Sequence, residues 1–231
     1  MKKYKHIFFD LDNTIWDFDS NSKEALSELY HKHRLEELGV TNLDHFISKY
    51  RERNEMMWDE YRLGKIDKPT LRDKRFELTF WDMGLDAETA PPELAAEYLY
   101  ISPRKTNLFP HAHEVLSYLS KKYLLHIITN GFEEAQHIKM QESKLSPYFK
   151  EVIISEHTGF RKPDTKIFNY AMQKTGALDS ESIMIGDSLE VDILGAKSAG
   201  WDTVFFNPGL KMHEEAVTYE IRSLEELIEI L

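Results

Sequence analysis

Two aspartates, Asp10 and Asp12, stand two positions apart directly after an apolar run at residues 4–9, and Thr14 follows them. In an extended chain alternate side chains point to the same side, so the two carboxylates can face one site. Acidic groups at the end of a buried strand lie where open α/β sheets bind their ligands. Taken alone, this spacing also fits acids that cap a strand end or a turn.

A later apolar run, at residues 124–129, ends with Thr129 and is followed by Asn130 and Gly131, which together bring a hydroxyl, an amide and a glycine. A hydroxyl and main-chain N–H groups near a helix start can cradle a phosphate oxygen, although Thr or Asn can equally be a helix N-cap.

Lys162 precedes Pro163, ahead of another expected helix. With Pro163 in the first helical turn, the ammonium would face the same sheet edge and could neutralise phosphate and carboxylate charge. The alternative is an exposed basic residue before a capped helix.

Asp187 follows the apolar run at residues 183–186, and Asp192 comes five positions later, in the opening turns of an expected helix. Hard carboxylate oxygens suit Mg²⁺, which proteins hold with a few carboxylates together with water and substrate phosphate. Each of these groups also has a plain structural explanation, such as helix capping by Asp187. Their shared position after successive strands favours one site for magnesium and phosphate.

The elements that must position these residues alternate between strand and helix. Buried strands are indicated at residues 4–9, 124–129, 151–155, 183–186 and 203–206, and helices at 112–122, 133–144, 164–175 and 190–199. This alternation predicts an α/β fold with a Rossmann-like parallel sheet. The catalytic core would comprise residues 1–17 and 105–231.

Residues 18–104 are different, with charged, leucine and aromatic residues at helical spacing. We find no convincing strand in this segment, and breaks near Gly39, Gly64, Gly84 and Pro91 predict about four helices. The segment is therefore expected to form an all-helical domain inserted after the first strand.

The composition limits the classes of partner. The chain has 231 residues, a formal net charge of −11 and no cysteine. Without cysteine it has no disulfide, thiolate nucleophile or thiolate-bound zinc, which fits a reducing, cytoplasmic location. The acidic balance disfavours nucleic acid polymers, whose phosphates would be repelled. The first residues turn acidic too soon for a signal peptide or a membrane span, so no membrane association is expected.

Four segments, FFDLDNT, IITNG, RKPD and IGDSLEVD, match in order the four motifs of the haloacid dehalogenase superfamily. The resemblance covers essentially the whole chain, and the inserted helical segment resembles the C1-type cap of that superfamily. TIWDFDSNSKEAL, ITNGFEEAQ and ISEHTGFRKPD further resemble the branch of noncanonical pyrimidine nucleotidases, which are nucleoside 5′-monophosphatases.

This resemblance implies a Mg²⁺-dependent phosphatase in which Asp10 attacks phosphorus and forms an aspartyl-phosphate. Asp12 would act as general acid and then as general base. The metal ligands implied are the carboxylates of Asp10 and Asp187 and the main-chain carbonyl of Asp12, with Asp192 assisting from behind them.

The resemblance also implies how a small phosphorylated metabolite, first of all a nucleotide, would be bound. Thr129, Asn130, Gly131 and Lys162 would contact the phosphoryl group. Trp16 follows the first motif directly, so we expect it near the mouth of the site, where it could stack on a base. Most other aromatic residues of the helical segment are expected to fill its core. The protein is expected to be a monomer or a small homo-oligomer.

Several alternatives share the fold. A sugar-phosphate phosphatase or a phosphomutase would use the same motifs. A dehalogenase needs neither Mg²⁺ nor the second acid of the first motif, so Asp12 and Asp187 disfavour it. A non-catalytic protein that binds phosphorylated metabolites need not keep nucleophile, acid and metal ligands together, and the intact set disfavours that as well.

Overall fold

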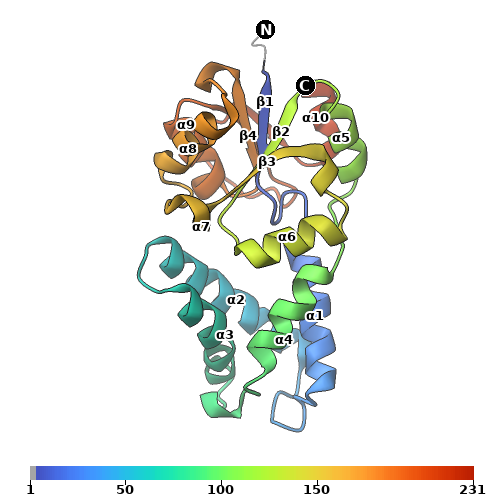
Figure 1. Cartoon of the computed structure of the whole chain (residues 1–231). Coiled ribbons are helices and arrows are strands. Elements are labelled where there is room, and N and C mark those ends of the chain that lie inside the picture. The colour runs from blue at the N-terminus through green and yellow to red at the C-terminus, as the bar shows by residue number, and fades with distance from the viewer. Residues whose placement is uncertain (1–3) are drawn as a thin grey trace. The chain divides into compact units, whose positions relative to one another are not determined.

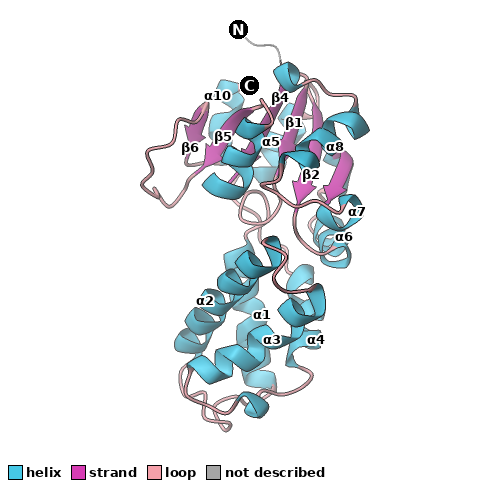
Figure 2. Ribbon diagram, turned by 90° about the vertical axis from the view of Figure 1, so that its left-hand side faces the viewer, coloured by secondary structure: helices cyan, strands magenta, loops and turns pink. Residues whose placement is uncertain are grey.

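A computed structural model describes residues 4–231 and contains a six-stranded sheet with the strand order β3-β2-β1-β4-β5-β6 (Figures 1 and 2). All neighbouring strands are parallel, which confirms the predicted α/β class. The order is that of a doubly wound Rossmann sheet. The strands are β1 (His6–Phe9), β2 (Leu124–Thr129), β3 (Phe149–Ile154), β4 (Ser182–Gly186), β5 (Asp202–Phe206) and β6 (Tyr219–Ile221).

β1 is the strand at which the chain reverses its order across the sheet. Ile7 pairs with Leu125 of β2 on one side and with Ile183 of β4 on the other. All residues of β1 are buried, as a short apolar strand covered on both faces should be. Because the strands are parallel and aligned, the segments that follow β1, β2 and β4 emerge at the same edge of the sheet.

Helices cover both faces of the sheet (Figure 1). Alternate residues of β1 enter different cores, with Ile7 packed in a cluster that includes Val115 of α5 and Phe8 in one that includes Phe168 of α8. The α-helices of this part are α5 (Ala112–Leu119), α6 (Glu133–Glu142), α7 (Ser155–Thr158), α8 (Thr165–Thr175), α9 (Gly195–Ser198) and α10 (Leu227–Ile230).

The chain divides into two compact units, one formed by the described residues up to Phe18 together with Thr106–Leu231, the other by Asp19–Lys105. The second unit contains helices and loops only (Figure 2), so the expectation of about four helices without a strand is confirmed for this stretch. Its α-helices are α1 (Phe18–Lys32), α2 (Leu43–Arg62), α3 (Lys68–Asp82) and α4 (Leu94–Ile101). They enclose a core that includes Phe46, Phe76 and Phe80.

Two local predictions differ from the structure. The helix expected at residues 190–199 begins as a π-helix, η5 (Leu189–Leu194), and only then continues as α9. Pro163 lies ahead of α8 instead of in its first turn, because Asp164 caps that helix by accepting from the Lys166 N–H.

In the part of the chain that the structure describes, no helix combines the length and the apolar character needed to cross a bilayer.

Candidate active site

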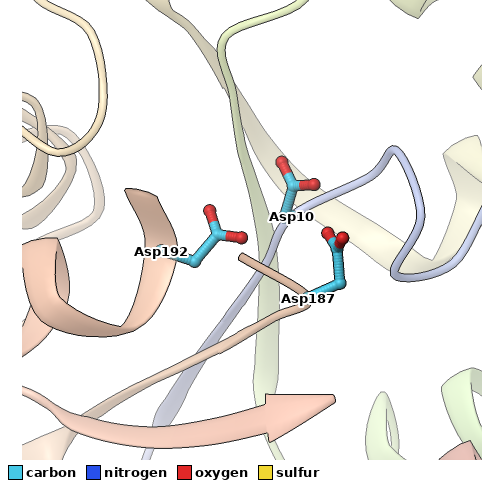
Figure 3. Close-up of side chains that lie close together, drawn as sticks. All are labelled: Asp10, Asp187 and Asp192. Atoms are coloured by element: carbon cyan, nitrogen blue, oxygen red, sulfur yellow. The ribbon is translucent and has the colours of Figure 1, made fainter. Parts of the chain in front are cut away.

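Three aspartates meet at the carboxyl edge of the sheet, beside the point where the strand order reverses (Figure 3). Asp10 directly follows β1, Asp187 follows β4, and Asp192 lies in η5. Each aspartate contributes one carboxylate oxygen to a group of three, and these oxygens all lie within 4.8 Å of one another. In doubly wound sheets, the crevice at this position is where ligands bind.

Lys162 joins two of these acids. Its Nζ lies 2.6 Å from Asp10 Oδ1 and 2.7 Å from Asp192 Oδ1, and the side chain is only 2% exposed. Burial alone would lower the pKa of the Lys162 ammonium, but the charges of Asp10 and Asp192 outweigh this effect and raise it above its ordinary value. The lysine therefore carries its charge at neutral pH.

The carboxylates hold more negative charge than this lysine offsets. Burial raises the pKa of Asp10 well above its usual value; Lys162 opposes the shift, and the charges of Asp192 and Asp187 add to it. Burial also raises the pKa of Asp187 to about 7, with the charge of Asp192 adding to the shift and Lys211 and Lys162 opposing it. Such a group of buried acids is the environment that an additional cation would stabilise.

The donor set fits Mg²⁺, because it consists of hard carboxylate oxygens that converge in a buried place. Asp192 differs from the other two acids in its contacts. Its Oδ1 accepts from Lys162, and its Oδ2 accepts from the Ser188 N–H at 3.1 Å. Asp10 and Asp187 are therefore the better candidates for direct metal ligands, and Asp192 would orient Lys162 behind them.

Asp12 is held by two residues of α6 that the sequence motifs did not single out. Gln136 Nε2 donates to Asp12 Oδ2 at 2.8 Å, and Lys139 Nζ donates to Asp12 Oδ1 at 2.6 Å. A signal for the pair was present in the sequence, because residues three apart lie on the same face of the helix that follows Gly131. The spacing alone does not show which face turns toward the site.

Thr129, Asn130 and Gly131 form the turn after β2, as expected, but their groups are partly engaged. Thr129 Oγ1 accepts from the Gly131 N–H at 3.0 Å, which leaves its own hydroxyl hydrogen available. Asn130 Nδ2 donates to the Lys162 carbonyl, and Asn130 Oδ1 accepts from the Lys162 N–H, both at 2.9 Å. The Asn130 side chain thus holds the lysine main chain, and its predicted contact with phosphate, which would be made by the main-chain N–H, stays a prediction.

Trp16 does not lie open at the mouth of a site. Its side chain is fully buried in a core that also contains Leu11 and Ile15. Lys139 Nζ lies 4.4 Å from the centre of the Trp16 ring. This burial argues against the predicted stacking of a base on Trp16.

The aromatic residues of the helical unit differ in exposure. Tyr61 is buried, as expected of a core residue, whereas Trp81 is 66% exposed. Trp81 is thus an exception to the expectation that most of these residues fill the core.

Comparison with known proteins identifies a family and several relatives. The family model described as haloacid dehalogenase-like hydrolase matches residues 4–200. The pyrimidine 5′-nucleotidase PynA of Streptococcus pneumoniae is 34% identical over 99% of this chain and 95% of its own length. The pyrimidine 5′-nucleotidase YjjG of Escherichia coli is 32% identical over 99% of this chain and 98% of its own.

A solved structure agrees over nearly the whole chain. The crystal structure of the HAD-hydrolase YfnB from Bacillus subtilis, described as bound to magnesium, superposes with a TM-score of 0.89. The alignment covers 99% of each chain at 32% sequence identity. The likeness therefore extends beyond the motif segments to both compact units.

Proposed function

The chain belongs to the haloacid dehalogenase-like hydrolases, and we propose that it is a Mg²⁺-dependent phosphomonoesterase for nucleoside 5′-monophosphates, with pyrimidine nucleotides preferred. The observation that carries the proposal is the placement of Asp10. Its carboxylate lies beside the buried ammonium of Lys162 and within reach of the carboxylate of Asp187. A nucleophile, a fixed positive charge and metal-type donors thus share one site.

In the first step, a carboxylate oxygen of Asp10 forms a bond to phosphorus while the bond from phosphorus to the nucleoside oxygen breaks. Asp12, in its protonated form, gives its proton to the departing oxygen. The products are a free nucleoside and a phosphoryl group on Asp10.

In the second step, Asp12 accepts a proton from a water molecule, whose oxygen bonds to phosphorus as the bond to Asp10 breaks. Inorganic phosphate leaves, and both aspartates return to their initial states. The same two carboxylates therefore serve both halves of the reaction.

The approach of an anionic carboxylate to an anionic phosphate requires positive charge nearby. Two unit charges about 4 Å apart repel by roughly 4 kcal/mol at an effective dielectric constant of 20. Lys162 supplies one fixed positive charge at Asp10. Bound by Asp10, Asp187 and the Asp12 main-chain carbonyl, Mg²⁺ would supply further charge stabilisation for the phosphoryl oxygens.

The choice of nucleotides is supported by the two relatives named pyrimidine 5′-nucleotidases, which match essentially the full chain. The test is the release of phosphate from nucleoside 5′-monophosphates, sugar phosphates and an aryl phosphate, each with Mg²⁺ and with EDTA. We expect pyrimidine 5′-monophosphates to be the best substrates and EDTA to abolish release. Asp10→Asn, which keeps the shape of the side chain, should reduce turnover to background.

The other outcomes have distinct meanings. If sugar phosphates are hydrolysed best, the phosphatase mechanism stands and the nucleotide preference is wrong. Conversion of a sugar phosphate to an isomer without phosphate release would indicate a mutase. Release that persists in EDTA or in Asp10→Asn would contradict the proposed chemistry.

A further inference from the structure

Helix α6 presents two polar side chains to a single carboxylate. Gln136 and Lys139 are one helical turn apart, and each donates a hydrogen bond to a different oxygen of Asp12. Both side chains are buried, with Gln136 1% and Lys139 5% exposed. Asp12 thus has its two oxygens fixed from outside the loop that carries it.

The surroundings are shaped for this contact. A Cβ atom on Gly131 would lie 1.6 Å from Gln136 Nε2, so any other residue at this position would displace the amide from its present place. Lys139 Nζ lies over the buried Trp16 ring, which holds the ammonium beside Asp12 by a cation–π contact.

The amide of Gln136 is used on one side only. Within residues 4–231, which the structure describes, Gln136 Oε1 is buried and has no hydrogen-bond partner. An unpaired buried acceptor costs roughly 1–3 kcal/mol. The hydrogen bond of this amide is therefore made by its donor side, which is directed at Asp12.

We infer that Gln136 and Lys139 are positioning residues that orient the Asp12 carboxyl for proton transfer, an inference that rests on the proposed function. We call this pair the Asp12 clamp. An ionised carboxylate has about four lone-pair positions, and the clamp occupies two of them, so Asp12 can still carry a proton for the leaving group. Removal of either arm would free the side chain to adopt other rotamers and so lower the efficiency of proton transfer.

Two substrates of similar shape test the clamp. Phenyl phosphate needs a proton on its departing oxygen, whereas 4-nitrophenyl phosphate releases a stable anion without one. The ratio kcat/KM reports steps up to departure of the leaving group and leaves out the later hydrolysis. For Lys139→Met and Gln136→Leu, we expect kcat/KM to fall at least about tenfold with phenyl phosphate and less than about threefold with 4-nitrophenyl phosphate, since general acid catalysis contributes roughly 10²–10⁴.

Matched variants control for the loss of charge or amide alone. Gln141→Leu changes an exposed residue of the same helix, and Lys121→Met changes an exposed lysine of the same unit. Neither should alter the ratio between the two substrates. Asp12→Asn provides the full effect of losing the acid, and the clamp variants should shift the ratio in the same direction.

Each possible result decides the inference. Equal losses with both substrates, or no loss, would overturn the clamp and leave the phosphatase in place. If wild-type protein releases phosphate neither from these two substrates nor from any nucleoside 5′-monophosphate, the proposed function and the clamp fall together. The comparison is made within each variant, so a partly unfolded preparation lowers both values and leaves their ratio unchanged, and Gln136→Leu gives the same test if Lys139→Met does not fold.

Discussion

Lys162 is fixed at both ends by separate groups. Its ammonium lies between Asp10 and Asp192, and its main-chain N–H and C=O both bond to the side chain of Asn130. Breaking a buried ion pair by removing one partner typically costs about 3–5 kcal/mol, so the ammonium position is strongly determined. The amide of Asn130 then sets where the lysine side chain starts.

Asn130→Ala is expected to reduce kcat by about 10- to 100-fold, because a displacement of roughly 1 Å at a reacting group can cost 10²-fold. KM should change less than about threefold, since both polar atoms of the side chain bond to the Lys162 main chain. Steady-state kinetics on a nucleoside monophosphate measure both constants. Asn130→Asp, which keeps an acceptor for the Lys162 N–H, should lie between wild type and Asn130→Ala.

The opposite pattern would contradict this role of the Asn130 side chain. A raised KM with unchanged kcat would identify the side chain as a contact that binds substrate equally in ground and transition states.

The sequence located Asp10, Lys162 and Asp187 at one site because each follows a predicted strand or precedes a helix in a parallel sheet. It could not locate the partners of Asp12. The direction of a carboxylate depends on its rotamer, and the contribution of Gln136 depends on which face of α6 turns inward. Both are settled by packing between segments far apart in the chain.

Strands β1 and β2 carry a buried pair of histidines. His6 Nδ1 lies 3.1 Å from His126 Nε2, and the rings stack with 5.3 Å between centroids. Burial, with a smaller electrostatic contribution from His6, lowers the pKa of His126 to about 4. Burial lowers the pKa of His6 too. Both rings are therefore neutral in the folded protein at neutral pH.

The contribution of His126 to the free energy of unfolding should fall as the pH is lowered from about 6.5 to about 4. In the unfolded chain His126 takes up a proton below pH about 6.5, whereas in the folded chain it resists protonation until about pH 4. The loss from this residue is at most about 1.4 kcal/mol per pH unit in that window. His126→Gln, which does not titrate, should lack this contribution, so that relative to wild type it loses less stability on going to low pH, as measured by urea unfolding between about pH 4.5 and 7.5.

An exposed histidine provides the control. His45→Gln in α2 should retain the wild-type dependence on pH. The raised pKa values of Asp10 and Asp187 make the free energy of unfolding rise as the pH is lowered, which opposes the effect of His126. Both aspartates are present in wild type, His126→Gln and His45→Gln, so their effect cancels when the pH dependences of these proteins are compared. Equal slopes for wild type and His126→Gln would show that the buried pair does not govern acid stability.

At the level of elements, the strands with continuous apolar runs were predictable, and β6 was not. β6 has three residues, YEI, of which only Ile221 is buried. It is held by pairing with β5, a contact that no local pattern reveals.

The π-helix η5 also escapes prediction, because its apolar spacing resembles that of an α-helix. In η5 the Ile193 N–H reaches back to the Ser188 carbonyl at 3.2 Å.

The whole molecule consists of two units with separate hydrophobic cores. The group of acids at residues 10, 187 and 192 and the lysine at 162 belong to the α/β unit alone. A ligand that binds only the folded form stabilises the structure that forms its site. The helical unit contributes none of these groups, so a metal ion bound by them would not stabilise it directly.

Mg²⁺ should therefore slow the hydrogen exchange of the α/β unit selectively. With free Mg²⁺ at 100 times its dissociation constant, the stabilisation is about 2.7 kcal/mol, which corresponds to roughly 100-fold slower exchange for amides that exchange through unfolding of the unit. Peptides covering β1 and β4 should show it, whereas those covering α2 and α3 should not. Asp187→Asn should weaken the effect, and Glu215→Gln, at an exposed position, should not. Equal slowing in both units would mean that they unfold together, whereas an unchanged response in Asp187→Asn would place the metal elsewhere.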